Sequence, residues 1–126
     1  MRMTVYRVEH ARYRNGPYRD ILTSSPVVFD TSDWFSEKHP LPNRDGIQHS
    51  VLHRRLLYQD WKCGYGSLEQ VRSWFTPSQR TRLQRADYHL AVFHVRSCDV
   101  LTGYKQVIFK RDAYEIAHAL ELEALV

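Results

Sequence analysis

The hydrophobic pattern begins with an alternating segment near the N-terminus. Residues 4–10 read TVYRVEH, and in an extended chain each of the two faces would carry both apolar and polar side chains. Val5, Arg7 and Glu9 share one parity, and Tyr6, Val8 and His10 share the other. Alternation over this length predicts an early strand. The Asn-Gly-Pro at residues 15–17 then predicts a turn.

A helical pattern follows in the middle of the chain. Ser67 is a favoured N-cap residue, and Gln70 stands at the capping-box spacing from it. One apolar helix face is formed by Leu68, Val71, Trp74 and Phe75. Gly64 and Gly66 precede this helix, and they let the backbone turn from a strand into it.

A second, shorter helix is predicted over residues 77–86. Thr76 is its N-cap, Pro77 takes the first helical position, and Gln79 repeats the capping-box spacing. Two successive caps account for the polar residues of this stretch without any ligand.

The last third of the chain predicts two strands and a helix. Residues 88–95, YHLAVFHV, are apolar on both parities, which is typical of a central strand. A turn at Thr102-Gly103 leads to a strand at 104–110, which we expect to run antiparallel to 88–95. At the C-terminus, one helix face is formed by Ala113, Ile116, Ala117 and Leu120.

These elements predict an α+β fold: a small, mainly antiparallel sheet with two short central helices and a C-terminal helix packed against it. The length of 126 residues fits a single domain spanning residues 1–126. Residues 23–50 are irregular, and their Trp, Phe and Val side chains predict a loop region pinned to the body of the domain. A further strand is expected at 53–59. The chain has neither a secretion-type apolar segment at its start nor an apolar run long enough to span a membrane.

The net charge and the high arginine content of the chain favour an acidic partner. The net charge is +4, and arginine far outnumbers lysine. Arginine favours bidentate contacts with carboxylate or phosphate groups. The expected binding surface consists of Arg54, Arg55, Arg72, Arg80, Arg82 and Arg85. The alternative is a solvated helix face with no partner.

Catalytic and metal-binding patterns are weak. His49 and His53 are spaced as a pair, but no third zinc ligand is marked by a motif. Cys63 follows Lys62, yet no nucleophile signature surrounds it. The residues therefore favour a protein without catalytic residues, metal or cofactor.

Four segments, VYRVEH, NGPYR, CGYGSLEQVRSWF and GYKQVIF, resemble small proteins carried by phages and prophages. The resemblance covers most of the chain outside residues 23–50. Small phage-borne accessory proteins often inhibit host defence, as anti-CRISPR proteins do, and they act largely by binding. The resemblance therefore implies an inhibitor that works in the host cytoplasm.

A second resemblance is to the ADP-ribosyltransferase fold. That fold often has an early strand with Tyr-Arg or a similar pair, a strand-helix unit that starts with Ser, and late antiparallel strands with an acidic catalytic residue. Tyr6, Arg7, Ser67 and Gln106 occupy these places. The resemblance implies that Arg7 and Ser67 hold the pyrophosphate and ribose of NAD. Gln106 stands where Glu is expected, so this copy either binds NAD without catalysis or uses another acid such as Glu9.

Three functions follow, in order of preference. The first is binding and inhibition of a host protein or nucleoprotein complex with an acidic surface, such as a CRISPR-type defence system. The second is NAD binding by an ADP-ribosyltransferase-like protein, and the third is nucleic-acid binding. The sequence leaves the identity of the partner and the oligomeric state open.

Overall fold

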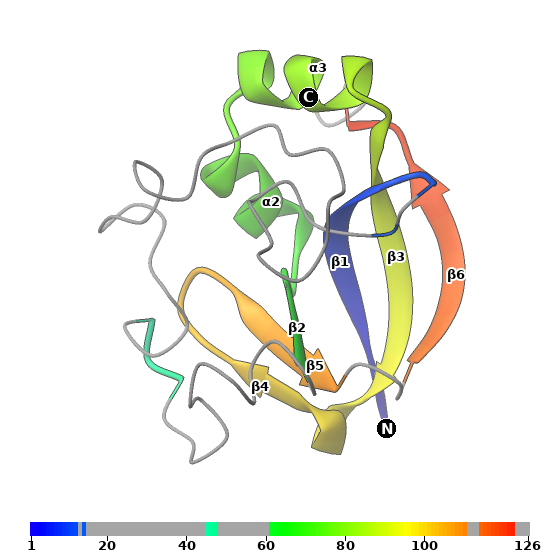
Figure 1. The fold of residues 1–126 in the computed structure, drawn as a ribbon. Helices are drawn as coiled ribbons and strands as arrows, with labels where there is room; N and C mark the ends of the chain where they lie inside the picture. Colours follow the sequence, from blue (N-terminus) through cyan, green and yellow to red (C-terminus); the bar gives the residue numbers. More distant parts are fainter. Residues whose placement is uncertain (13, 15–44, 48–60, 111–113, 123–126) are drawn as a thin grey trace.

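The structure, a computed structural model, describes residues 1–12, 14, 45–47, 61–110 and 114–122 (Figure 1). The helices are α2 (Leu68–Trp74) and α3 (Pro77–Arg85), with a 3-10 turn at Ser97–Asp99. The strands are β1 (Arg2–His10), β2 (Trp61–Gly64), β3 (Tyr88–Arg96), β4 (Val100–Thr102), β5 (Val107–Lys110) and β6 (Tyr114–Leu120). Helices and antiparallel strands together confirm the α+β class.

The strands form two three-stranded antiparallel sheets, with the orders β1-β3-β6 and β2-β5-β4. An isolated bridge joins them, in which Tyr6 and Tyr65 exchange backbone hydrogen bonds of 2.8 and 2.7 Å. Gly64 permits this close approach, because a Cβ there would lie 2.7 Å from the carbonyl oxygen of Tyr6. The glycine therefore serves the contact between the sheets as well as the turn.

Two hydrophobic clusters cover opposite faces of the first sheet. One cluster joins Val8, Tyr88 and Leu90 to the helices and contains Val71, Trp74, Phe75 and Leu83. The other joins Val5, Ala91, Phe93 and Val95 to the second sheet through Val100, Val107 and Phe109. The first sheet is thus a central layer, with the helix pair on one face and the second sheet on the other.

The helix caps explain where the two helices start. Thr76 and Gln79 form a full capping box, in which each side chain accepts the backbone N–H of the other residue. At α2, Ser67 Oγ accepts the N–H of Gln70 at 3.2 Å, but Gln70 Oε1 accepts the N–H of Gly66 at 2.7 Å. The predicted box at Ser67 is therefore only half formed, and Gln70 instead fixes the preceding glycine.

The prediction of a C-terminal helix is wrong. Residues Tyr114–Leu120 form β6, which pairs with β3 over Leu90–Val95. Ala, Glu and Leu have high helix propensity, but tertiary context overrides this weak preference. Because β3 pairs with β1 along one edge, its other edge offers a row of backbone partners, and the C-terminal segment takes them.

The predicted pairing of residues 104–110 with 88–95 is also wrong. Only Val107–Lys110 are extended, and this strand pairs with β2 and β4. The 3-10 turn at Ser97–Asp99 redirects the chain from β3 into the second sheet, so the Thr102-Gly103 turn connects β4 to β5. The strands predicted at 4–10 and 88–95, and the central position of the latter, are confirmed.

Candidate functional site

The two sheets meet where β1, β2 and β5 come together. Tyr6 of β1 is bridged to Tyr65, the residue that follows β2. Gly64 pairs with Val107, so Gln106 lies one step beyond this pair, beside Tyr65. Ser67 follows two residues later, at the start of α2. The fold thus gathers the strands and the helix start that carry Tyr6, Arg7, Ser67 and Gln106 at one junction.

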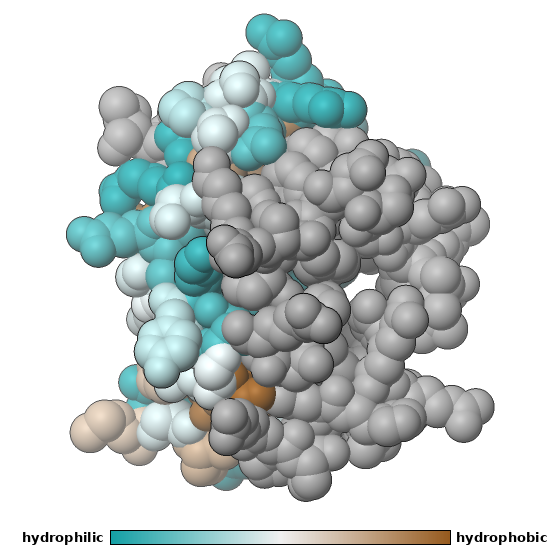
Figure 2. All heavy atoms as spheres, turned by 90° about the vertical axis from the view of Figure 1, so that its left-hand side faces the viewer, coloured by the Kyte–Doolittle hydropathy of each residue, from teal (hydrophilic) through white to brown (hydrophobic). Residues whose placement is uncertain are grey.

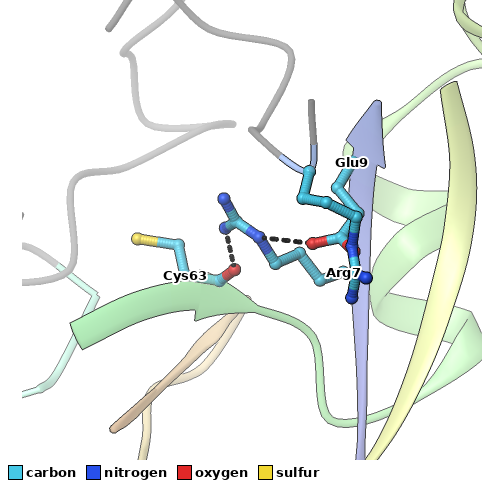
Figure 3. Close-up of polar contacts among 4 residues, drawn as sticks. Arg7, Glu9 and Cys63 are labelled. Atoms are coloured by element: carbon cyan, nitrogen blue, oxygen red, sulfur yellow. Dashed lines mark hydrogen bonds and ion pairs between the residues drawn. The ribbon is translucent and has the colours of Figure 1, made fainter. Parts of the chain in front are cut away.

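Arg7 and Glu9 form a buried ion pair at this junction (Figure 3). Arg7 Nε lies 3.3 Å from Glu9 Oε2, and Arg7 Nη1 donates to the backbone carbonyl oxygen of Cys63 at 2.7 Å. The Glu9 side chain is 0% exposed. Arg7 therefore crosses from β1 to β2 and ties the two sheets together through its side chain.

Arg14 adds a second positive charge to Glu9. Its Nε donates to Glu9 Oε1 at 2.8 Å, from a backbone with a φ of 61°. Two guanidinium groups around one carboxylate leave an excess of one positive charge. Arg7 Nε and Glu9 Oε2 lie close without hydrogen-bond alignment, and neither atom makes a hydrogen bond. Since burying a polar atom without a hydrogen bond is costly, this cluster is a candidate for a role other than stability.

His89 lies at the same end of this sheet as Glu9, because it is the cross-strand partner of Glu9. Burial lowers the pKa of His89, and the carboxylate of Glu9 opposes this effect. Arg14 and His10 add to the lowering. His89 is therefore held in its neutral form in this environment at neutral pH.

The cysteines are both free thiols, and they differ in exposure. Cys98 is exposed and Cys63 is partly buried. Burial raises the pKa of the Cys63 thiol, and the guanidinium of Arg7 only partly offsets this. The thiol also points away from Arg7, which contacts the Cys63 carbonyl instead (Figure 3). These features do not support an activated Cys63 nucleophile.

The loop between β4 and β5 is fixed from two sides. The buried carboxylate of Asp45 accepts backbone N–H groups of Lys105, at 2.9 and 3.1 Å, and of Gln106, at 3.0 Å. From the other side, Gln70 Nε2 of α2 donates to the carbonyl oxygen of Tyr104 at 3.2 Å. This loop carries Gln106, which is 4% exposed, and Tyr104, which is exposed.

The helix pair carries part of the predicted basic surface. Arg72, Arg82 and Arg85 are exposed, whereas Arg80 is 6% exposed. Arg80 Nη1 donates to the carbonyl oxygen of Phe75, so it satisfies a backbone acceptor at the end of α2. Burial, and secondarily the charge of Arg72, lowers the pKa of Arg80. The prediction that Arg80 belongs to the exposed surface is corrected, and Arg54 and Arg55 lie outside the described residues.

The exposed charges within the described part of the chain are mainly positive. Within the described ranges, nine exposed residues are basic: Arg2, Arg12, Arg14, Arg72, Arg82, Arg85, Arg96, Lys105 and Lys110. Three exposed residues are acidic: Glu69, Asp87 and Glu121. Glu9, Asp45 and Asp99 are buried, and Arg80 is buried as well, whereas Arg7 and Lys62 are half-buried. Where residues are coloured in Figure 2, those of the upper part of the face, at the level of α2 and α3 in Figure 1, are mostly hydrophilic.

Sequence reasoning missed the roles of Arg14 and Asp45. Arg7 and Glu9 share a strand face by their spacing, so the pair itself could have been found from the sequence. Asp45 lies 60 residues from Lys105, and no local pattern marks that contact. Among the residues with described placement, no group of three or more His, Cys, Asp and Glu could hold a metal ion. His49 and His53 fall outside that set.

The comparisons with known proteins identify the family. Residues 3–123 match the model of the Bacteriophage T4 Y00F protein family. The chain belongs to this family. Searches of curated proteins and of solved structures gave no match. The Y00F match supports the expected kinship with phage proteins, and it identifies this chain as a phage-type accessory protein. None of the helices in the described part is long and apolar enough to cross a membrane.

Proposed function

We propose that this Y00F-family protein binds an acidic surface on a host macromolecular complex and inhibits it, a CRISPR-type defence system being the class of target that we favour. The observation that carries this proposal is the surplus of exposed basic side chains over acidic ones among the residues that the structure describes. A surface of one sign attracts a partner of the opposite sign and speeds their association.

The helix pair is the part of this surface best suited to a specific contact. Arg72, Arg82 and Arg85 project from short helices whose starts are capped and whose apolar faces are buried. The backbone beneath the arginines is therefore fixed before binding, which reduces the entropy lost on association. Arginine is also among the residues that most often dominate interface energies.

Charge reversal tests this proposal. The variant Arg82→Glu with Arg85→Glu changes the charge of α3, and Arg2→Glu with Lys110→Glu changes it equally at the opposite end of the molecule (Figure 1). We expect the α3 variant to lose at least about tenfold in affinity for the host complex, since each 1.4 kcal/mol is tenfold. Phage plating on hosts with and without the defence system gives the matching functional measurement.

The control variant should retain most of the affinity and the protection of the phage. Equal losses in both variants would show that binding depends on net charge and not on the helix pair. No loss in either variant, with both proteins folded by circular dichroism, would refute the proposed surface.

A second candidate function, NAD binding of the ADP-ribosyltransferase type, is supported by the junction of β1, β2 and β5. The elements bearing Tyr6, Arg7, Ser67 and Gln106 meet there. The excess positive charge of Arg7 and Arg14 over Glu9 suits a pyrophosphate. Two of the four residues are already engaged, since Arg7 pairs with Glu9 and Ser67 caps α2.

Thermal unfolding with and without millimolar NAD tests this second candidate. Binding to the folded state alone raises the melting temperature with ligand concentration. We expect the NAD-dependent rise in wild type and its loss in Arg7→Ala, each compared with the same protein without NAD. Gln106→Ala gives a second test that leaves the buried ion pair intact. A wild-type protein without any rise at millimolar NAD excludes this function.

A further inference from the structure

Tyr104 is an exposed aromatic side chain on a fixed loop. Its exposed fraction is 85%, and Met1 is the only other large hydrophobic side chain of comparable exposure within the described residues. A chain terminus such as Met1 is commonly exposed, whereas Tyr104 lies inside the chain between β4 and β5. The ring of Tyr104 therefore contributes little to the core and is accessible to a partner.

The backbone beneath Tyr104 is held by bonds from two distant segments. Its N–H donates to the carbonyl oxygen of Asp45 at 3.0 Å, and its carbonyl oxygen accepts from Gln70 Nε2 at 3.2 Å. The carboxylate of Asp45 also binds the next two backbone N–H groups. The ring is therefore presented from a fixed backbone, and a partner has only its two side-chain torsion angles to immobilise.

Gly46 lies directly beside the ring. Its φ is +82°, and a Cβ at this position would lie 2.6 Å from Tyr104 Cε2 and 3.0 Å from Cδ2. A side chain at position 46 would therefore displace the ring. The segment 45–47 thus both fixes the loop and leaves room for Tyr104 in its exposed position.

The residue that follows Tyr104 carries an exposed basic side chain. This is Lys105, whereas the exposed Arg72 of α2 is two residues from Gln70 and lies on another side of that helix. Glu69 is the acidic residue exposed on the same helix. An aromatic ring next to a basic group, among described residues of which nine exposed ones are basic and three acidic, suits a ligand with planar rings and negative charge.

We infer that Tyr104 is a stacking platform for a base of single-stranded nucleic acid, with Lys105 beside the phosphates. This inference rests on the proposed function, because it gives the anionic partner its chemistry. Single-stranded nucleic acid fits better than an acidic protein, since it supplies the ring and the charge in every unit of its chain. A duplex fits less well, because its base faces are covered by stacking.

Fluorescence anisotropy tests this inference by measuring the binding of two fluorescein-labelled 20-nucleotide probes, oligo(dT) and oligo(U). We expect Tyr104→Ala to weaken binding about tenfold and Tyr104→Phe to retain it within about twofold, because stacking needs the ring and not the hydroxyl. Lys105→Gln should lower the salt dependence of the affinity, whereas Lys110→Gln, at the far end of β5, should not. The DNA and RNA probes together show which sugar is preferred.

Several outcomes would overturn the inference. Tyr104→Ala binding as tightly as wild type, or tighter binding of a duplex of equal length, would remove the stacking role. The inference would also be overturned if neither probe showed salt-dependent binding. If Arg82→Glu with Arg85→Glu still abolished binding to the host complex in that case, the partner would be an acidic protein and the proposed function would stand. Equal melting temperatures of wild type and the Tyr104 variants serve as the folding control.

Discussion

Both faces of β1 bury apolar side chains, but only one of them also buries an ion pair. One face presents Val8, which is 2% exposed and packs with Tyr88 and Leu90 under the helices. The other face presents Arg7 and Glu9, and the carboxylate of Glu9 is as fully buried as any core side chain. This second face also carries Val5, which is fully buried against the second sheet, so the charged pair occupies only one end of it.

The apolar side chains and the ion pair differ in what their burial contributes to the free energy of unfolding. Burial of apolar surface stabilises the fold with no compensating requirement. A buried ion pair must first recover the cost of removing both charges from water, and its net contribution is often near zero. The pair at Arg7 and Glu9 therefore has a better explanation in the connection of β1 to β2, or in a ligand, than in stability.

The largest expected effect comes from breaking the ion pair on one side. Glu9→Leu leaves Arg7 without its carboxylate, and removal of one partner of a buried pair costs about 3–5 kcal/mol. We expect urea denaturation to show this loss in the free energy of unfolding. The double variant Arg7→Met with Glu9→Leu should recover to within about 1 kcal/mol of wild type. A double variant as unstable as Glu9→Leu would show that the pair is needed for stability itself.

A smaller loss in the free energy of unfolding is expected from a substitution on the face that carries Val8. Val8→Ala removes buried methyl groups and leaves a cavity beside Tyr88, at a cost of about 2 kcal/mol. The same denaturation experiment measures it. A loss that exceeds that of Glu9→Leu would reverse the comparison between the two faces.

The smallest effect is a dependence of stability on pH through His89. Its folded pKa lies below the ordinary value of 6.5, so the unfolded chain binds the proton more readily. The contribution of His89 to stability is therefore complete above pH 6.5 and declines as the pH falls toward the folded pKa. His89→Gln should have a flatter stability profile than wild type over this range. Parallel profiles would assign the acid sensitivity to groups other than His89.

The elements that local chemistry specifies could be predicted from the sequence. The start of α3 at Thr76 and Pro77 follows from a capping box, and the buried face of α2 follows from the spacing of Val71, Trp74 and Phe75. The C-terminal segment could not be predicted in the same way, because its composition favours a helix while the open edge of β3 requires a strand. Strand pairing is a contact between distant segments, and the helix or strand propensity of a segment carries no information about its pairing partner.

The candidate site, too, could be predicted from the sequence only in part. The sequence pointed to arginines on the helices, and Arg72, Arg82 and Arg85 are exposed there. It gave no indication that Arg80 turns inward to the carbonyl of Phe75, because helix periodicity does not show where a neighbouring helix ends. It also left Tyr104 unremarked, since exposure of an aromatic side chain depends on what the rest of the fold leaves uncovered.

The sequence by itself determined the two helices, the early and central strands, and an arginine-rich surface, because caps, periodicity and charge act within a few residues. The tertiary structure decided how the strands divide into two sheets and where these meet, because both depend on contacts between segments far apart in the chain. It also decided which charged side chains are buried. Glu9, Asp45 and Asp99 are buried, and so is Arg80, because their partners depend on how the chain folds back on itself.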